Sequence, residues 1–226
     1  MKLVRRSVQL LYPEDARTVM RRIEEAGRNC YQSYQHMTDG SAEALIRKFV
    51  KANHGSPLEF ADITVRIVAD RAFLAQITRH RLASFCVESA RYNDYKGGCK
   101  FIEPVGLEDG EQTTAWLETC AYAESTYDRL RELGVKPETA RSVLPMSLAT
   151  SIVMKANVRE WRHILELRLD KHAQPDMRQI MEMALDVFYL HYPVLFEDLW
   201  DEYGKEILSH RAVTSHVTWR VYGDVL

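Results

Sequence analysis

Arginine and histidine side chains gather in one short stretch of the chain, and their combination suits the binding of an anion. Gln76, Arg79 and His80 are spaced so that a helix running through them would present all three on one face. Arg81 and Arg91 add two cations, and an arginine fork is well shaped to grip a phosphate. The apolar residues between them predict a partly buried segment, in which unpaired charges would be costly. We therefore favour a ligand site here over a solvated basic helix end.

A second polar group lies on a predicted helix near the end of the chain. Arg159 and His163 are four residues apart and share a face, whereas Arg168 lies about half a turn away. One rigid helix cannot aim both arginines at the same atom from one side. Either they serve different ligands, or different copies of the chain share them. Taken alone, Asn157 reads as a plain helix cap and His163 as an ordinary helix histidine.

Two further segments give weaker signals. His54 and Ser56 belong to a His-Gly-Ser-Pro turn, for which a structural role is the default interpretation. Arg141 alone would be taken as a surface arginine on a helix. No G-x-G-x-x-G, G-x-x-x-x-G-K or G-x-S-x-G pattern occurs. Any phosphate must therefore be held by arginines and helix ends.

The composition is that of a folded, nearly neutral protein. The chain has 226 residues, 46% of them hydrophobic, and 30 Lys+Arg against 32 Asp+Glu for a net charge of −2. This balance argues against binding to long nucleic acids or membrane surfaces, but not against binding of small anions. No stretch approaches the roughly 20 apolar residues of a spanning helix, and no signal peptide is recognisable. The four cysteines form no CxxC pair, which predicts no metal site and reduced, mostly buried thiols in a cytoplasmic protein.

Hydrophobic periodicity predicts the elements that position these residues. Alternating apolar residues predict strands at Val4–Leu11, Phe60–Val68 and Leu148–Lys155. Helices are predicted through Val19–Ala26, and over Ser41–Ala52, Ala72–His80, Glu111–Leu133, Pro137–Leu144, Asn157–Leu169, Asp176–His191 and Pro193–Tyr203. Leu82–Gly98 is expected to be irregular, and the last twenty residues stay unassigned. We predict one α+β domain over residues 1–226, helix-rich around a mainly antiparallel sheet, without a Rossmann dinucleotide fold.

Arg79, His80 and Arg81, followed after seven residues by Ser89, form a motif similar to that of the flavin-dependent thymidylate synthases. The resemblance covers a little over half the chain and keeps several motifs in the family's order. These are the His-Gly-Ser-Pro turn at 54–57, the block at 76–92, the Ala-Arg-Ser-Val-Leu-Pro segment at 140–145, the Asn-x-Arg at 157–159, the Leu-Arg at 167–168 and the His-Ala-Gln at 172–174.

The resemblance implies a set of residue roles. Residues expected to contact FAD are His54, Ser56, Arg79, His80, Arg81, Asn157, Arg159 and His163. Residues expected to hold dUMP are Gln76, Arg79, Glu88, Ser89, Arg91, Arg141 and Arg168. Arg168 would also be the catalytic residue, stabilising negative charge that develops around N3 of the uracil.

The implied reaction is the reductive methylation of dUMP to dTMP, with methylenetetrahydrofolate as one-carbon donor and FAD reduced by NADPH. The family is a homotetramer with active sites shared between subunits. Cys86 and Val87 stand where many members carry Asn-Glu, so Glu88 is the carboxylate left to substitute, and Phe60 stands where many have His. No protein nucleophile is needed, and no clear base adjoins Cys86.

Two other interpretations stay open from the sequence. The first is another nucleotide-binding flavoprotein oxidoreductase, which would share the FAD site but transfer a different group. The second, from a different class, is an RNA-binding module that uses the basic motif. The second predicts a colourless protein with strongly salt-dependent RNA affinity, whereas both flavoproteins would be yellow.

Overall fold

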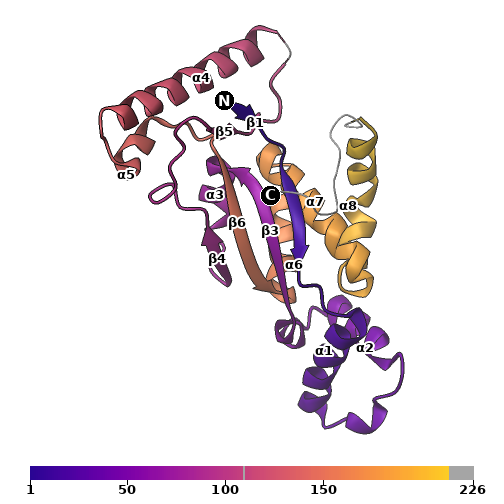
Figure 1. The fold of residues 1–226 in the computed structure, drawn as a ribbon. Helices are drawn as coiled ribbons and strands as arrows, with labels where there is room; N and C mark the ends of the chain where they lie inside the picture. The colour runs from indigo at the N-terminus through magenta and orange to yellow at the C-terminus, as the bar shows by residue number, and fades with distance from the viewer. Residues whose placement is uncertain (109, 214–226) are drawn as a thin grey trace. The chain divides into compact units, whose positions relative to one another are not determined.

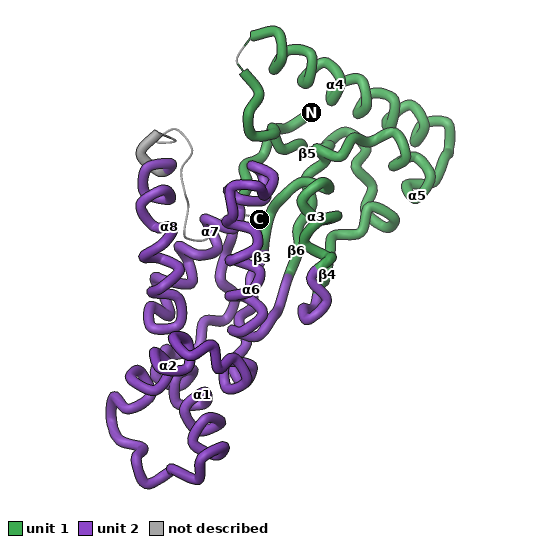
Figure 2. The backbone as a smooth tube through the Cα atoms, turned by 180° about the vertical axis from the view of Figure 1, so that it is seen from behind, with its two compact units in different colours: residues 1–7, 67–79, 85–153 green, residues 8–66, 80–84, 154–226 purple. Residues whose placement is uncertain are grey.

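A computed structural model describes residues 1–108 and 110–213 of the chain (Figure 1). These residues form two compact units, shown in different colours in Figure 2. Unit 1 comprises residues 1–7, 67–79 and 85–153, and unit 2 the remainder. The chain passes between the units several times, because the long strands belong partly to each. The single domain over 1–226 stays a prediction.

The strands form one four-stranded sheet and one short pair. They are β1 (Lys2–Leu3), β2 (Ser7–Leu11), β3 (Asp62–Asp70), β4 (Ala83–Val87), β5 (Lys100–Phe101) and β6 (Ala149–Asn157). The larger sheet has the order β2-β3-β6-β4 and is antiparallel, as predicted, while β1 pairs with β5 in parallel. Ile63, Val65 and Ile67 of β3 are buried, and this alternation is what identifies the strand in the sequence.

Helices make up most of the rest of the chain. They are α1 (Ala16–Tyr31), α2 (Ser41–Lys51), α3 (Arg71–Ile77), α4 (Glu111–Glu132), α5 (Pro137–Ala140), α6 (Val158–Leu169), α7 (Pro175–His191) and α8 (Pro193–Val213), with 3-10 turns η1 (Tyr34–His36), η2 (Ser56–Phe60) and η3 (Arg141–Val143). Asp70 caps α3 by accepting from the backbone N–H of Phe73 at 2.7 Å. Asn157 caps α6 in the same way, as its sequence position predicts.

Several predicted elements differ from the structure, among them the strand predicted over Val4–Leu11, of which only Ser7–Leu11 forms. The helix predicted to reach His80 ends at Ile77, and the backbone N–H of Arg79 donates to the carbonyl of Gln76, three residues back, in a tightened last turn. The stretch expected to be irregular contains β4, whose residues alternate between half-buried and exposed. The helix predicted over Pro137–Leu144 tightens into η3 after Ala140. In the stretch left unassigned, α8 continues to Val213, and the remainder lies outside the described residues.

Aromatic packing joins α6, α7 and α8 in unit 2. The ring of Phe188 lies 4.9 Å from that of Trp161 and 5.2 Å from that of Phe196, measured between centroids. The indole N–H of Trp161 donates to the carbonyl of Ile63 in β3 at 2.9 Å, which fixes α6 on the sheet. The buried Arg162 donates to Asp198 and to the carbonyl of Leu195 on α8. Helix α6 is therefore held on two sides.

The structure predicts that the buried Arg162 stabilises the fold more than the exposed Arg47, which also binds an acidic residue of α8. Arg162→Met should lower the free energy of unfolding by about 2 to 4 kcal/mol, because it leaves a carbonyl and a carboxylate without a donor. Arg47→Met, which removes the exposed ion pair with Glu197, should cost less than about 1 kcal/mol. Urea unfolding of both variants tests this, and equal losses would contradict it.

Candidate active site

Helix α6 carries three of the predicted site residues, and its packing decides where they point. Trp161, Ile164 and Leu165 form the buried face of the helix. Arg159 and His163 are consequently exposed, and Arg168 in the last turn is half-buried. The two arginines make different contacts, as the half-turn between them predicts.

Arg168 is bound to His80. Its Nε–H donates to Nε2 of His80 at 3.0 Å, although 88 residues separate the two in the sequence. His80 is only 7% exposed. Burial, with smaller contributions from the nearby Arg168 and His163, lowers the pKa of His80 to about 4. The imidazole is therefore neutral at pH 7. Because Nε2 accepts from Arg168, the proton of the ring is assigned to Nδ1.

Arg159 lies against the turn that carries His54 and Ser56. Its Nη1 forms an ion pair with Glu59 in η2 at 2.5 Å. A Cβ built on Gly55 would come within 2.7 Å of Nε of Arg159, so the absence of a side chain at this position permits the approach. Two motifs about a hundred residues apart in the sequence thus meet in unit 2.

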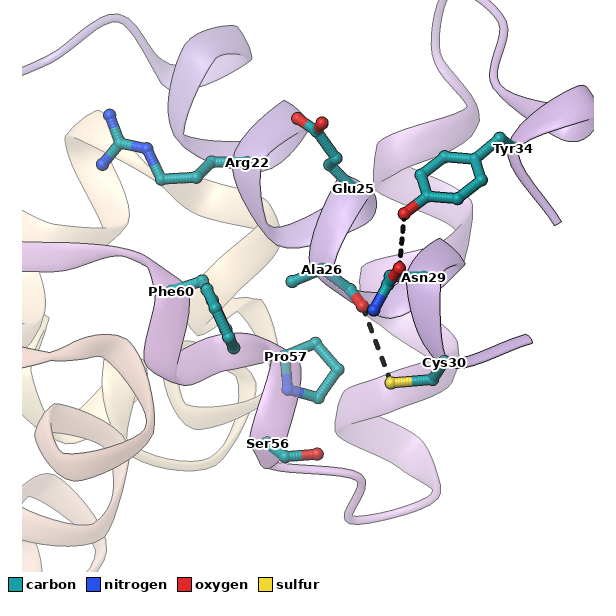
Figure 3. Close-up of a pocket in the computed structure, with 9 residues that line it drawn as sticks. All are labelled: Arg22, Glu25, Ala26, Asn29, Cys30, Tyr34, Ser56, Pro57 and Phe60. Carbon is teal, nitrogen blue, oxygen red and sulfur yellow. Dashed lines mark hydrogen bonds between the residues drawn. The ribbon is translucent and has the colours of Figure 1, made fainter. Parts of the chain in front are cut away.

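A pocket of about 410 Å³ opens between α1, η1 and η2 (Figure 3). Ser56 is the predicted FAD residue in its wall. The other lining residues are Arg22, Glu25, Ala26, Asn29, Cys30, Tyr34, Pro57 and Phe60. Tyr34 donates its hydroxyl hydrogen to Oδ1 of Asn29 at 2.7 Å on one side of this pocket. The lining residues on α1 and η1 belong to none of the motifs recognised in the sequence, so no pattern predicted this pocket.

In unit 1, two of the predicted dUMP arginines share one acidic residue. Nε of Arg91 donates to the carboxylate of Glu138 at 3.0 Å, and Nε of Arg141 donates to the backbone carbonyl of Glu138 at 3.1 Å. Ser89 lies beside them, since its hydroxyl oxygen accepts from the backbone N–H of Arg91 at 3.3 Å. Both guanidinium groups are exposed, which leaves their terminal nitrogens open to a ligand.

The carboxylate of Glu88 accepts two hydrogen bonds from other residues of unit 1. One carboxylate oxygen accepts from the hydroxyl of Tyr95 at 2.9 Å, and the other accepts from the backbone N–H of Ser151 at 3.2 Å. Burial, together with Glu88, raises the pKa of Tyr95 to about 12. A role for Glu88 in holding dUMP stays a prediction, and its present bonds are structural.

The arginines of the sequence motif are more exposed than predicted. Arg79, Arg81 and Arg91 are all exposed, and Tyr92 is 78% exposed, so the argument from buried charge is wrong for them. Arg79 and Arg81 form no ion pair with any residue in 1–108 or 110–213. The shared helix face predicted for Gln76, Arg79 and His80 is also wrong, because α3 ends before the last two.

The cysteines differ in part from the prediction. All four are free thiols, but only Cys99 and Cys120 are buried, while Cys30 and Cys86 are exposed. Burial raises the pKa of the Cys99 thiol to about 12. Across the described ranges, no helix has both the length and the apolar character needed to cross a bilayer.

Residues 14–194 match the family described as thymidylate synthase complementing protein. The chain belongs to this family. A flavin-dependent thymidylate synthase of Synechocystis sp. is 31% identical over 165 residues, which cover 67% of this chain and 77% of that protein. One from Haloarcula marismortui is 30% identical over 186 residues, covering 69% and 74%. The resemblance stated from the motifs is therefore confirmed.

Solved structures show the fold of this family member. The UMP/dUMP methylase PolB from Streptomyces cacaoi, bound with 5-Br dUMP, superimposes with a TM-score of 0.76. The alignment covers 87% of this chain and 96% of that protein at 24% identity. A second structure of that methylase, bound with 5-Br UMP, gives a TM-score of 0.73. The similarity confirms the predicted α+β fold, without a Rossmann arrangement.

The low pKa of His80 predicts a specific pH dependence for the stability of this thymidylate synthase family member. Unfolded histidine titrates near 6.5 and folded His80 near 4, so the unfolded chain binds more protons between these values. Stability present at neutral pH is therefore lost as the pH falls from about 6.5 to about 4, by up to about 3 kcal/mol. His80→Gln should lack this component.

Unfolding free energies of the wild type and both His→Gln variants across this pH range test the prediction. The exposed His36, whose side chain forms no hydrogen bond or ion pair with the rest of residues 1–108 and 110–213, provides the control, and His36→Gln should keep the wild-type pH dependence. A His80→Gln protein with the same pH dependence as the wild type would contradict the low pKa.

Proposed function

We propose that this protein methylates dUMP to dTMP, with methylenetetrahydrofolate as one-carbon donor and FAD reduced by NADPH as hydride source. Membership of the thymidylate synthase complementing protein family is the observation that carries the proposal. The curated relatives at about 30% identity are named flavin-dependent thymidylate synthases. The site chemistry agrees with such an enzyme, since it offers arginines for anionic ligands.

Unit 2 supplies most of the residues that would hold FAD. They are His54, Ser56, His80, Arg81, Asn157, Arg159 and His163. Their chemistry fits a dinucleotide, because Arg81 is an exposed cation with no ion pair among the described residues and Arg159 lies against the glycine turn. When bound, FAD supplies hydride transfer. The protein's own task is to bind and orient it.

Unit 1 supplies most of the residues that would hold dUMP. They are Gln76, Arg79, Glu88, Ser89, Arg91 and Arg141. Arg91 and Arg141 are held through Glu138 with their forks exposed, which suits a phosphate that accepts two hydrogen bonds from one side chain. Such pre-positioned donors lose little side-chain freedom when the ligand binds.

Arg168 is proposed as the catalytic residue. Its Nε is committed to His80, so its terminal nitrogens are the donors left for a substrate. A guanidinium at this position would stabilise negative charge that develops around N3 of the uracil. Cys86 is exposed and is not required as a nucleophile. We further propose a cytoplasmic homotetramer in which several copies contribute to each site.

A turnover assay with one component omitted at a time tests the proposed function. The purified protein should be yellow, should bleach with NADPH, and should form dTMP only when dUMP, methylenetetrahydrofolate and NADPH are all present. A correctly folded protein that neither retains nor takes up FAD would contradict the proposal. In the same assay, Arg168→Ala should remove most dTMP formation and leave flavin reduction largely intact. The exposed Arg17→Ala is the control and should behave as the wild type.

The contact between Arg159 and Gly55 generates a separate prediction. Gly55 has a φ of −74°, so alanine fits the backbone, but its methyl group would displace the guanidinium of Arg159. Gly55→Ala should weaken FAD binding about tenfold, the size of one lost charged hydrogen bond, with little change in thermal stability. Gly98→Ala is the matched control, since a Cβ there meets nothing within 4 Å. Equal FAD affinity in both variants would contradict a role for Arg159.

A further inference from the structure

A buried carboxylate lies next to His80, and nothing in the proposed reaction uses it. Glu160 is 7% exposed, and its Oε1 lies 3.8 Å from Nδ1 of His80. Its carboxylate accepts no hydrogen bond from any residue in the described ranges. Burying a carboxylate with so little compensation is costly, which calls for a reason.

Helix capping does not supply the reason. The Asn-x-x-Glu pattern at 157–160 predicts a reciprocal box, in which the carboxylate of Glu160 would accept from the backbone N–H of Asn157. Only half of this box forms, because the side chain of Asn157 accepts from the backbone N–H of Glu160 at 2.8 Å. The carboxylate itself faces the imidazole.

The imidazole connects this carboxylate to the proposed catalytic arginine. His80 presents Nδ1 to Glu160 and accepts from Nε of Arg168 through Nε2 at 3.0 Å. That bond exists only if the proton of the neutral imidazole is on Nδ1. With the proton on Nε2, two N–H donors would face each other and push the guanidinium away.

We propose that Glu160 is a positioning residue, which holds the proton of His80 on Nδ1 and thereby keeps Nε2 as the acceptor that orients Arg168. The carboxylate favours the tautomer whose N–H points at it, as acidic partners of histidine do in other sites. The inference rests on the proposed function in its assignment of Arg168 to the uracil. It gives His80 a role toward Arg168 in addition to the predicted contact with FAD.

Few charged groups surround the relay that Glu160, His80 and Arg168 form. His80 faces Glu160, Arg168 and His163, whose ring centroid lies 6.3 Å away. Burial raises the pKa of Glu160, while His163 and Arg159 act in the opposite direction. A protonated Glu160 would be a poorer acceptor, so the relay is expected to weaken in acid.

Removing the carboxylate of Glu160 tests its proposed effect on His80 and Arg168. Glu160→Met should lower kcat for dTMP formation about 10- to 100-fold, as expected for a lost charged interaction, with FAD content and flavin reduction by NADPH retained. Glu160→Gln should recover most of the activity, because the partial negative charge of its amide oxygen would still favour the N–H on Nδ1. Glu166→Met, at an exposed position of the same helix, is the matched control and should match the wild type.

A double variant separates positioning from structural support. In His80→Gln, the side-chain amide oxygen can accept from Arg168 without any choice of tautomer. Adding Glu160→Met to His80→Gln should therefore cost less than about twofold, because the two effects are coupled. A cost as large as in the wild-type background would overturn the proposal.

A spectroscopic measurement keeps the test independent of turnover. In the holoprotein labelled with ¹⁵N-histidine, the shifts of His80 should report a neutral ring protonated on Nδ1, and Glu160→Met should shift it toward a mixture of tautomers. His80→Gln assigns the signal. A wild-type ring protonated on Nε2 would overturn the relay, whether or not Glu160→Met folds. If dTMP formation fails but this tautomer is observed, the proposed function is wrong and the relay stands.

Discussion

The buried face of α6 determines where the charged side chains of this helix can lie. Trp161 is anchored to β3 through its indole N–H and to α7 through Phe188, so the helix cannot rotate about its axis. Arg159 is thereby directed to the glycine turn and Arg168 to His80. Hydrophobic packing thus sets the geometry of the polar site, and the site adds few constraints of its own.

A neutral histidine beside a cation is an efficient way to hold an arginine. A carboxylate would bind Arg168 more strongly, but it would cancel the positive charge that a developing anion needs. The imidazole fixes the same nitrogen without adding negative charge, and its low pKa keeps it neutral at physiological pH. In this arrangement the imidazole of His80 lies between the carboxylate of Glu160 and the guanidinium of Arg168, so the carboxylate acts mainly on the imidazole.

Most of the fold follows from local sequence patterns. The apolar alternation of β3 and the caps Asp70 and Asn157 are readable in the sequence and are present in the structure. The end of α3 differs from the prediction, because no glycine or proline marks it in the sequence. Likewise the pairing of His80 with Arg168 depends on contacts 88 residues apart in the sequence. Motifs identify which residues matter, whereas side-chain partners depend on tertiary packing.

Within a chain of net charge −2, the arginines of the candidate site differ in how they are bonded to the protein. Arg91, Arg141 and Arg168 are each held by a hydrogen bond through Nε, which leaves the terminal nitrogens to a ligand. These three side chains lose conformational entropy when the chain folds, so less entropy is lost when a ligand binds. Arg79 and Arg81 have no ion pair among the described residues. Under the proposed function, directional recognition would come from Arg91, Arg141 and Arg168, and Arg79 and Arg81 would add electrostatic affinity.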